Sequence, residues 1–222
     1  MRCVMDEGLL ETLPLAQRLA LSYAPKTARS DMLGLFALEE RLARIVSGGG
    51  EPMIAQLKLA WWRDRFSQSP DEWPEGEPLL SVLSQWSGDT TRLASLVDGW
   101  EGLLAERLDR KVLAQFLRGK ALAWSALADG LSVRETNAAV QQAVEEIALF
   151  DLVHNLSDPS EIALVEDRLR SQPWTRPRLS RRVRPVAVLH ALARRARGAG
   201  RRDLLDGPGA MATAMRVGIT GR

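Results

Sequence analysis

The chain has 222 residues, of which 45% are hydrophobic and 26% charged, and a formal net charge of +2, a composition ordinary for a soluble globular protein. Its single cysteine, Cys3, excludes an internal disulfide, and no apolar run approaches the ~20 residues of a membrane-spanning helix. We expect one domain over residues 1–222 and a cytoplasmic location, because the first 30 residues lack the pattern of a secretory signal.

Helical periodicity begins near the N-terminus. A first helix is expected over residues 8–23, interrupted or started at Pro14, and Ser30-Asp31 are expected to cap a second one that ends at a triple-glycine turn, residues 48–50. A third helix should begin near Pro52, which suits a first helical turn. This helix is expected to direct six side chains towards a core: Met53, Leu57, Leu59, Ala60, Trp61 and Phe66.

The same periodicity continues after a proline-rich loop over residues 67–78. It predicts a short helix to about Trp86 and two helices over residues 92–131, with a break near Asp109-Arg110 and an end at Gly130. Ser132 and Glu135 form a capping-box pattern for a helix over residues 132–157. Further helices are expected over residues 160–171, 184–198 and about 210–217. About ten helices without an alternating strand pattern predict an all-α bundle.

Charge is unevenly distributed along this order. Residues 168–222 hold 14 arginines and two acids, a charge of +12, so residues 1–167 carry −10. A basic segment on an acidic body favours an anionic partner, such as lipid headgroups, nucleic acid or the acidic body itself. The alternative is a solvated surface in an arginine-rich chain, in which arginines outnumber lysines 26 to 4.

Several stretches resemble the squalene/phytoene synthase family of head-to-head prenyl synthases. Ala37-Leu38 matches the start of the family's first aspartate-rich helix, and Leu96-Val97-Asp98-Gly99 matches a later helix. The segment Leu59-Ala60-Trp61-Trp62-Arg63 matches its tryptophan-arginine signature. The resemblance implies a single-domain isoprenoid-synthase-like bundle around a central cavity. The side chains expected to line that cavity are Phe36, Trp61, Trp62, Trp100 and Trp124.

The metal-binding motifs of that family are degenerate in this chain. The first-motif positions are occupied by Glu40, Ala43, Arg44 and Ser47, and the second-motif positions by Asp151, His154 and Asn155. Family enzymes hold diphosphates through Mg²⁺, which prefers carboxylate oxygens, and no two aspartates in this chain stand four residues apart. Arg44 would add positive charge where a divalent cation binds. We therefore predict no catalytic residue, no metal and no cofactor.

Other chemistries have weaker signals. His154 and His190 lack partners at metal-ligand spacing and are interpreted as packing or surface residues. The triple glycine lacks the lysine and serine of a phosphate-binding loop and is interpreted as a turn. Nucleic-acid binding is not expected, because no helical DNA-reading motif is evident.

The resulting hypothesis is a catalytically degenerate relative of the prenyl synthases that binds an isoprenoid or lipid-like ligand or acts in assembly. A branch of the broader family assembles respiratory complex I, which implies a membrane-complex subunit as partner. The arginine-rich segment is then expected to contact the anionic surface of the inner membrane. The alternative is an active Mg²⁺-dependent prenyltransferase that uses non-standard acidic residues.

Overall fold

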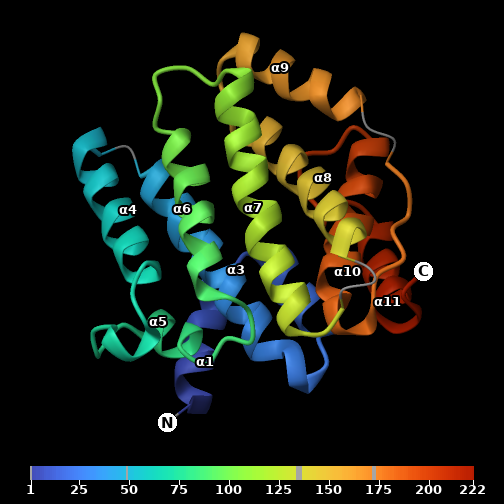
Figure 1. Cartoon of the computed structure of the whole chain (residues 1–222). Helices are drawn as coiled ribbons and strands as arrows, with labels where there is room; N and C mark the ends of the chain where they lie inside the picture. The colour runs from blue at the N-terminus through green and yellow to red at the C-terminus, as the bar shows by residue number, and fades with distance from the viewer. Residues whose placement is uncertain (1, 49, 134–136, 172–173) are drawn as a thin grey trace.

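Turns and loops of different lengths join a series of helices along the described chain. The computed structural model describes residues 2–48, 50–133, 137–171 and 174–222, with side chains from residue 7 onwards. These residues form eleven α-helices and no strand, which confirms the predicted all-α bundle of about ten helices (Figure 1). The helices are α1 (Arg2–Glu11), α2 (Leu15–Leu21), α3 (Lys26–Ser47), α4 (Pro52–Phe66), α5 (Pro78–Leu83), α6 (Leu93–Gly102), α7 (Arg110–Gly130), α8 (Asn137–Asn155), α9 (Pro159–Arg170), α10 (Arg184–Gly198) and α11 (Gly209–Thr220). Three 3-10 turns are η1 (Pro70–Glu72), η2 (Thr90–Arg92) and η4 (Arg181–Val183).

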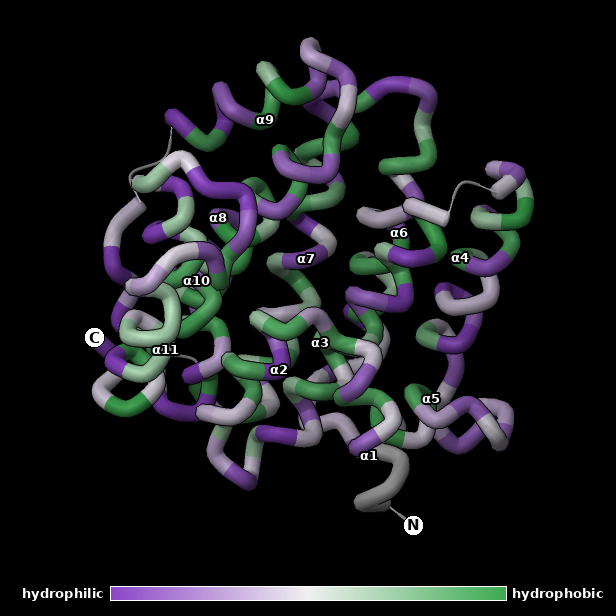
Figure 2. Tube along the Cα trace, turned by 180° about the vertical axis from the view of Figure 1, so that it is seen from behind, coloured by the Kyte–Doolittle hydropathy of each residue, from purple (hydrophilic) through white to green (hydrophobic). Residues whose placement is uncertain are grey.

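Helix α3 lies at the centre of the bundle. Its buried residues run from Ala28 to Leu42, and it contacts α1, α2, α4, α5, α6 and α7. It passes behind α6 and α7 in Figure 1 and in front of them in Figure 2. On the other side of α7, helix α8 packs against α7, α9 and α10, and α10 packs against α11. The N-terminal half, α1–α6, and the C-terminal half, α7–α11, therefore meet along α3 and α7.

Helices α6 and α7 pack closely because glycines lie at their contact. A Cβ atom on Gly119 would stand 2.3 Å from the Ser95 carbonyl oxygen, and one on Gly99 would stand 3.2 Å from Phe116 Cα. Only residues without a side chain allow the two backbones this separation. The approach fixes the position of α7 relative to the N-terminal half.

The start of α3 differs from the prediction. Ser30 and Asp31 do not cap this helix, which begins at Lys26 after Pro25. Asp31 is buried inside the helix, where its Oδ1 and Oδ2 accept hydrogen bonds from Ser87 N and Oγ, each 2.9 Å long. Its carbonyl oxygen accepts the Trp86 indole N–H at 3.0 Å. Asp31 therefore accepts hydrogen bonds from a distant loop instead of capping the N-terminus of its own helix.

Other boundaries follow the local signals. Pro14 separates α1 from α2, Pro52 opens α4, and the Asp109 carboxylate caps α7 by accepting the Val112 N–H at 2.8 Å. Helix α7 ends at Gly130 as predicted. In the predicted capping box of Ser132 with Glu135, Glu135 lies outside the described residues.

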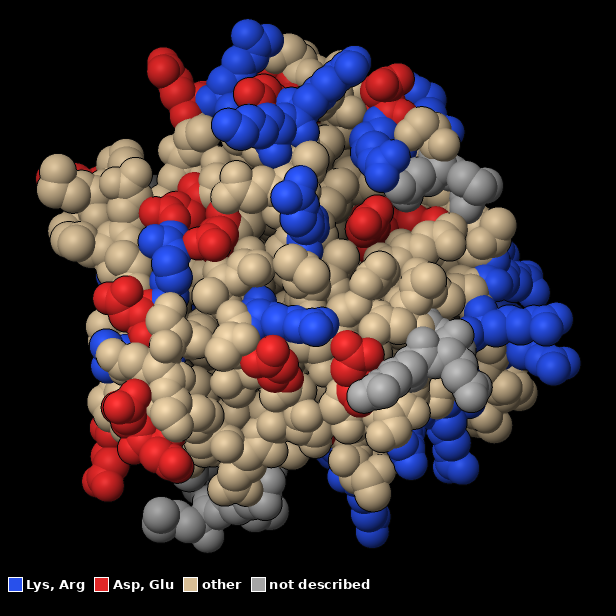
Figure 3. Space-filling view, viewed as in Figure 1, with Lys and Arg blue, Asp and Glu red and all other residues tan. Residues whose placement is uncertain are grey.

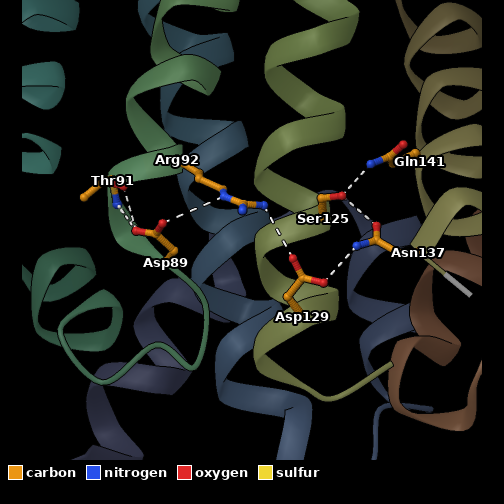
Figure 4. Close-up of polar contacts among 7 residues, drawn as sticks. All are labelled: Asp89, Thr91, Arg92, Ser125, Asp129, Asn137 and Gln141. Carbon is orange, nitrogen blue, oxygen red and sulfur yellow. Dashed lines mark hydrogen bonds and ion pairs between the residues drawn. The ribbon is translucent and has the colours of Figure 1, made fainter. Parts of the chain in front are cut away.

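A polar network ties η2 to α7 and α8 (Figure 4). Asp129 on α7 pairs with Arg92 at 3.4 Å and accepts the Asn137 amide N–H at 3.0 Å. The buried Ser125 hydroxyl donates to Asn137 Oδ1 at 2.6 Å and accepts from Gln141. These contacts give the buried Ser125 hydroxyl its hydrogen-bond partners and join η2, α7 and α8.

The predicted core face of α4 is partly wrong. Leu59 and Phe66 are buried, but Met53, Leu57 and Trp61 are 68%, 61% and 38% exposed. Helix α4 lies at the edge of the bundle in Figure 1 and packs against α6 and α3, so only one narrow face reaches the core. None of the helices in the described ranges combines the length and apolar character needed to cross a bilayer.

Candidate ligand-binding cavity

Two adjoining cavities lie between the halves of the bundle. The smaller has a volume of about 310 Å³ and the larger about 590 Å³. Four residues line both: Pro14, Glu40, Asp151 and Asn155. The smaller cavity is walled by apolar side chains of α3, α7, α8 and α10, among them Phe36, Trp124, Ile147, Ala148, Val186 and Leu189. The larger extends towards α6 and includes Trp100, Leu103, Phe116 and Leu156.

Three carboxylates converge on the smaller cavity, Glu39 and Glu40 from α3 and Asp151 from α8. Glu39 is almost fully buried and its charge is balanced locally. Its Oε2 lies 3.2 Å from the Lys120 ammonium, and its Oε1 accepts the Trp124 indole N–H at 3.0 Å. Lys120 Nζ also lies 5.5 Å from the ring centres of Trp100 and Phe116. Glu39 is therefore committed to internal partners.

The other two carboxylates favour their neutral forms more than usual. Burial raises the pKa of Glu40, and the neighbouring charges of Asp151 and Glu39 act in the same direction, against Arg44, whose Nε lies 3.2 Å from Glu40 Oε1. Burial likewise raises the pKa of Asp151, with Glu39 adding to it and Lys120 and His154 opposing it. Asp151 faces the cavity space, where water reaches it although protein atoms surround it.

The structure brings the degenerate motif positions together. Glu40 and Asp151 share the wall between the cavities, and Ala43, Arg44 and Ser47 line the larger one. His154 lines the smaller cavity, and its Nδ1 donates to the Phe150 carbonyl oxygen at 2.6 Å. Asn155 Nδ2 donates to the Asp151 carbonyl oxygen at 2.8 Å. First-motif and second-motif positions thus face each other across one space.

The five aromatic residues separate into two groups. Phe36 and Trp124 line the smaller cavity, with ring centres 5.2 Å apart, and Trp100 lines the larger. Trp61 and Trp62 lie on α4, away from both cavities. Trp62 is buried and stacks on Phe66 at 5.8 Å, whereas Trp61 reaches the outer surface. Aromatic content alone does not distinguish cavity wall from core.

The two best-matched segments of the resemblance contact each other elsewhere. Arg63 Nε on α4 lies 2.6 Å from Asp98 Oδ1 on α6, and Arg63 also pairs with Glu101. This pairing holds α4 on α6 and leaves the cavity acids untouched. It gives the tryptophan-arginine segment a packing role in this structure.

Sequence reasoning missed Glu39 and Lys120. Each interrupts an otherwise apolar helical face, Glu39 beside Leu35, Leu38 and Leu42, and Lys120 between Phe116 and Trp124. Opposite charges on the buried faces of two helices indicate an internal ion pair, because neither is tolerated alone. That pattern was available from the sequence as a signal.

The arrangement suits a ligand that is mainly apolar with an uncharged polar group. The walls of the smaller cavity are mainly hydrophobic. Its polar lining includes the Glu39–Lys120 pair and the two carboxyl groups with raised pKa values, together with Gln17, His154, Asn155 and Arg202. Within the described residues, no three His, Cys, Asp or Glu side chains form a group that could hold a metal ion. The comparisons with known proteins gave no match to a family model, to a curated protein or to a solved structure.

Proposed function

We propose that the chain is a catalytically degenerate, squalene/phytoene synthase-like protein that binds an isoprenoid or similar lipid in the two cavities. The observation that carries the proposal is the Glu39–Lys120 ion pair beside Glu40 and Asp151. Carboxylates stand on the two helices that present metal ligands in the resembled family, but internal cations already balance part of their charge. A diphosphate brought there would be repelled by any carboxylate that is ionised, and the cations beside Glu39 and Glu40 are already paired with them.

The expected ligand is therefore an isoprenoid alcohol or hydrocarbon rather than a prenyl diphosphate. Its chain would lie along Phe36, Trp124 and Ile147, and its polar group near Glu40 and Asp151. A carboxyl group with a raised pKa can donate a hydrogen bond to a hydroxyl when protonated. Apolar burial along the chain would supply most of the affinity.

Titration with farnesol, followed through tryptophan fluorescence, tests this proposal, because Trp124 is part of the wall. Farnesol bound beside Trp124 should quench the tryptophan fluorescence. Ala148→Trp, which fills the smaller cavity, should abolish this quenching. Ala114→Trp is the matched control, since Ala114 is exposed on α7 and lines neither cavity. Circular dichroism shows whether each variant is folded.

The rival enzyme function is tested in parallel with farnesyl and geranylgeranyl diphosphates and Mg²⁺. Release of diphosphate that is lost in Asp151→Asn would establish the active prenyltransferase and refute the degenerate reading. Farnesol binding without diphosphate release is the outcome we expect.

A partner-binding role in assembly of a membrane complex is the second candidate. Four apolar side chains of α4 share an outward face: Met53, Ile54, Leu57 and Trp61. Exposed apolar groups on one helix face often mark a protein interface. An affinity pull-down in mild detergent should recover a membrane-complex subunit with the wild type and lose it with Leu57→Ser/Trp61→Ser. Met211→Ser/Met215→Ser is the control, because it removes two exposed methionines from α11.

A further inference from the structure

Another pocket lies on the opposite side of α10 from the smaller of the two cavities described above, which we call the lipid cavity. It has a volume of about 310 Å³ and lies between α10, α11 and the segment before η4. Helix α10 turns Val186 and Leu189 towards the lipid cavity and Ala187, His190 and Ala191 towards this pocket. We name it the basic pocket because five arginines line it: Arg176, Arg194, Arg195, Arg216 and Arg222.

The arginines of the basic pocket are not balanced by acids. No Asp or Glu is among the described residues that line it, and two of its arginines donate hydrogen bonds to main-chain oxygens. Arg195 Nη1 donates to the Asp206 carbonyl oxygen at 2.8 Å, and Arg216 donates to a main-chain oxygen of Arg222. The ion pairs of the arginine-rich segment involve other residues, namely Arg168, Arg170 and Arg201. Figure 3 shows lysine and arginine side chains concentrated on the side of the molecule where α10 and α11 lie.

The floor of the pocket is fixed by a buried pair. His190 is 2% exposed, and its Nε2 bonds to Glu146 Oε2 on α8, while Glu146 Oε1 accepts the Gln142 amide N–H at 2.9 Å. Trp174 stacks on the imidazole with ring centres 5.7 Å apart. Both carboxylate oxygens of Glu146 are thus hydrogen-bonded, one of them to the His190 that lines the pocket. Glu146 itself does not line the pocket, so it offers no carboxylate oxygen to the arginines.

We propose that the basic pocket binds a ligand with two or more linked phosphate groups. Guanidinium groups match phosphate oxygens in paired hydrogen bonds and keep their charge at all physiological pH values. One phosphate monoester carries about −1.5 to −2 at neutral pH, so a single group leaves most of five positive charges unbalanced and two groups approach neutrality. The volume corresponds to roughly ten water molecules at ~30 Å³ each, which exceeds the needs of one small ion.

Two kinds of ligand could present several phosphate groups to the basic pocket: a free polyphosphate, and a lipid headgroup that carries additional phosphates. The inference goes beyond the proposed lipid cavity and does not depend on it, because the two sites use opposite faces of α10. Loss of farnesol binding would leave this proposal intact, and the reverse also holds.

Isothermal titration calorimetry of the full chain with inorganic pyrophosphate, at physiological salt, is the primary test. We expect pyrophosphate to bind at least tenfold more tightly than orthophosphate or sulfate. Arg176→Gln/Arg194→Gln should weaken pyrophosphate binding at least tenfold. Its matched control is Arg178→Gln/Arg181→Gln, which removes the same charge from exposed arginines that lie outside the pocket, and which should change binding less than twofold.

Vesicle flotation separates the two sources. Phosphatidylcholine vesicles that contain a bisphosphorylated inositol lipid are compared with phosphatidylserine vesicles of equal surface charge. Binding to the former alone, displaced by pyrophosphate, assigns a lipid headgroup; calorimetric binding without flotation assigns a free polyphosphate.

Three results would overturn the proposal. They are equal losses in the pocket and control variants, absence of both pyrophosphate and vesicle binding, and binding of single-stranded RNA that pyrophosphate does not displace. Since neutralising mutually repelling arginines should not lower the melting temperature, unfolding cannot mimic the expected loss. Pyrophosphate should also raise the melting temperature of the wild type and leave that of Arg176→Gln/Arg194→Gln unchanged.

Discussion

Glu39 on α3 and Lys120 on α7 form an ion pair of 3.2 Å in which each side chain is 10% exposed. The pair joins the two helices along which the halves of the bundle meet. Its cost of desolvation is offset by the Trp124 indole N–H on Glu39 and by the aromatic rings beside Lys120. The same pair lines the smaller cavity.

Removing one partner of this pair should destabilise the protein strongly. Lys120→Met leaves Glu39 without its cation and should lower the free energy of unfolding by about 3–5 kcal/mol, measured by urea denaturation at pH 7. The double variant Glu39→Gln/Lys120→Met should recover most of that loss, because no charge is then left unpaired. Additive losses in the double variant would show that the two side chains act independently.

Asp151→Asn should stabilise the protein at neutral pH. The pKa of Asp151 is raised in the folded state, so the folded protein binds this proton more tightly than the unfolded chain does. Its contribution to the free energy of unfolding is therefore most favourable below the ordinary pKa of about 3.9 and falls as pH rises through the folded-state value. The melting temperature of the variant should exceed that of wild type at pH 7, and the difference should vanish in acid.

Asp89→Asn is the control with the opposite sign. Hydrogen bonds from Thr91, its hydroxyl first, lower the pKa of Asp89. This group stabilises the fold above its ordinary pKa and loses that effect as pH falls through the lower folded-state value. Asp89→Asn should therefore melt below wild type at pH 7. If both variants shifted the melting temperature in the same direction, the assignment of these two pKa shifts would be wrong.

Gly119→Ala should separate α6 from α7. The added methyl group would stand 2.3 Å from the Ser95 carbonyl oxygen, and backbone cannot move aside as a side chain can. We expect a loss of about 1–3 kcal/mol in the free energy of unfolding. In Gly102→Ala the new Cβ meets Val112 Cγ1 at 3.6 Å and Gln115 Cδ at 3.9 Å, both ordinary contacts, so this variant should be neutral or slightly stabilising. Equal stability of the two variants would contradict the close approach.

Asp129→Ala should disrupt the network of Figure 4. The change leaves Arg92 and the Asn137 amide without their shared acceptor, and an unmet polar group near the interior costs about 1–3 kcal/mol. Chemical denaturation measures the loss. Asp64→Ala is the comparison, because Asp64 is exposed on α4 and should contribute little to stability.

Local signals in the sequence were sufficient for most helices but not for their orientation. Pro52, Asp109 and Gly130 mark helix boundaries through backbone chemistry that acts within one turn. Which face of α4 meets the core depends on α6, against which it packs, and the Arg63–Asp98 pair joins the same two helices. For the same reason Trp61 was expected inside and lies outside.

The candidate site was partly accessible from the sequence. The motif positions Glu40 and Asp151 were identified separately, and the fold places them in one wall. The motifs themselves did not indicate the charge balance, because Lys120 belongs to a helix that they do not include. The basic pocket shows the same limit, since a run of arginines predicts positive charge but not which of them enclose a space.

The contact between Asp31 and Ser87 couples a surface loop to the central helix. The Ser87 amide belongs to no helix, yet it donates its hydrogen bond to a buried carboxylate of α3. Its exchange with deuterated solvent should therefore follow the slow opening of α3 rather than the fast fluctuations of a loop. The residues that follow α5 would then unfold together with α3, as one cooperative unit formed by segments more than fifty positions apart in the chain.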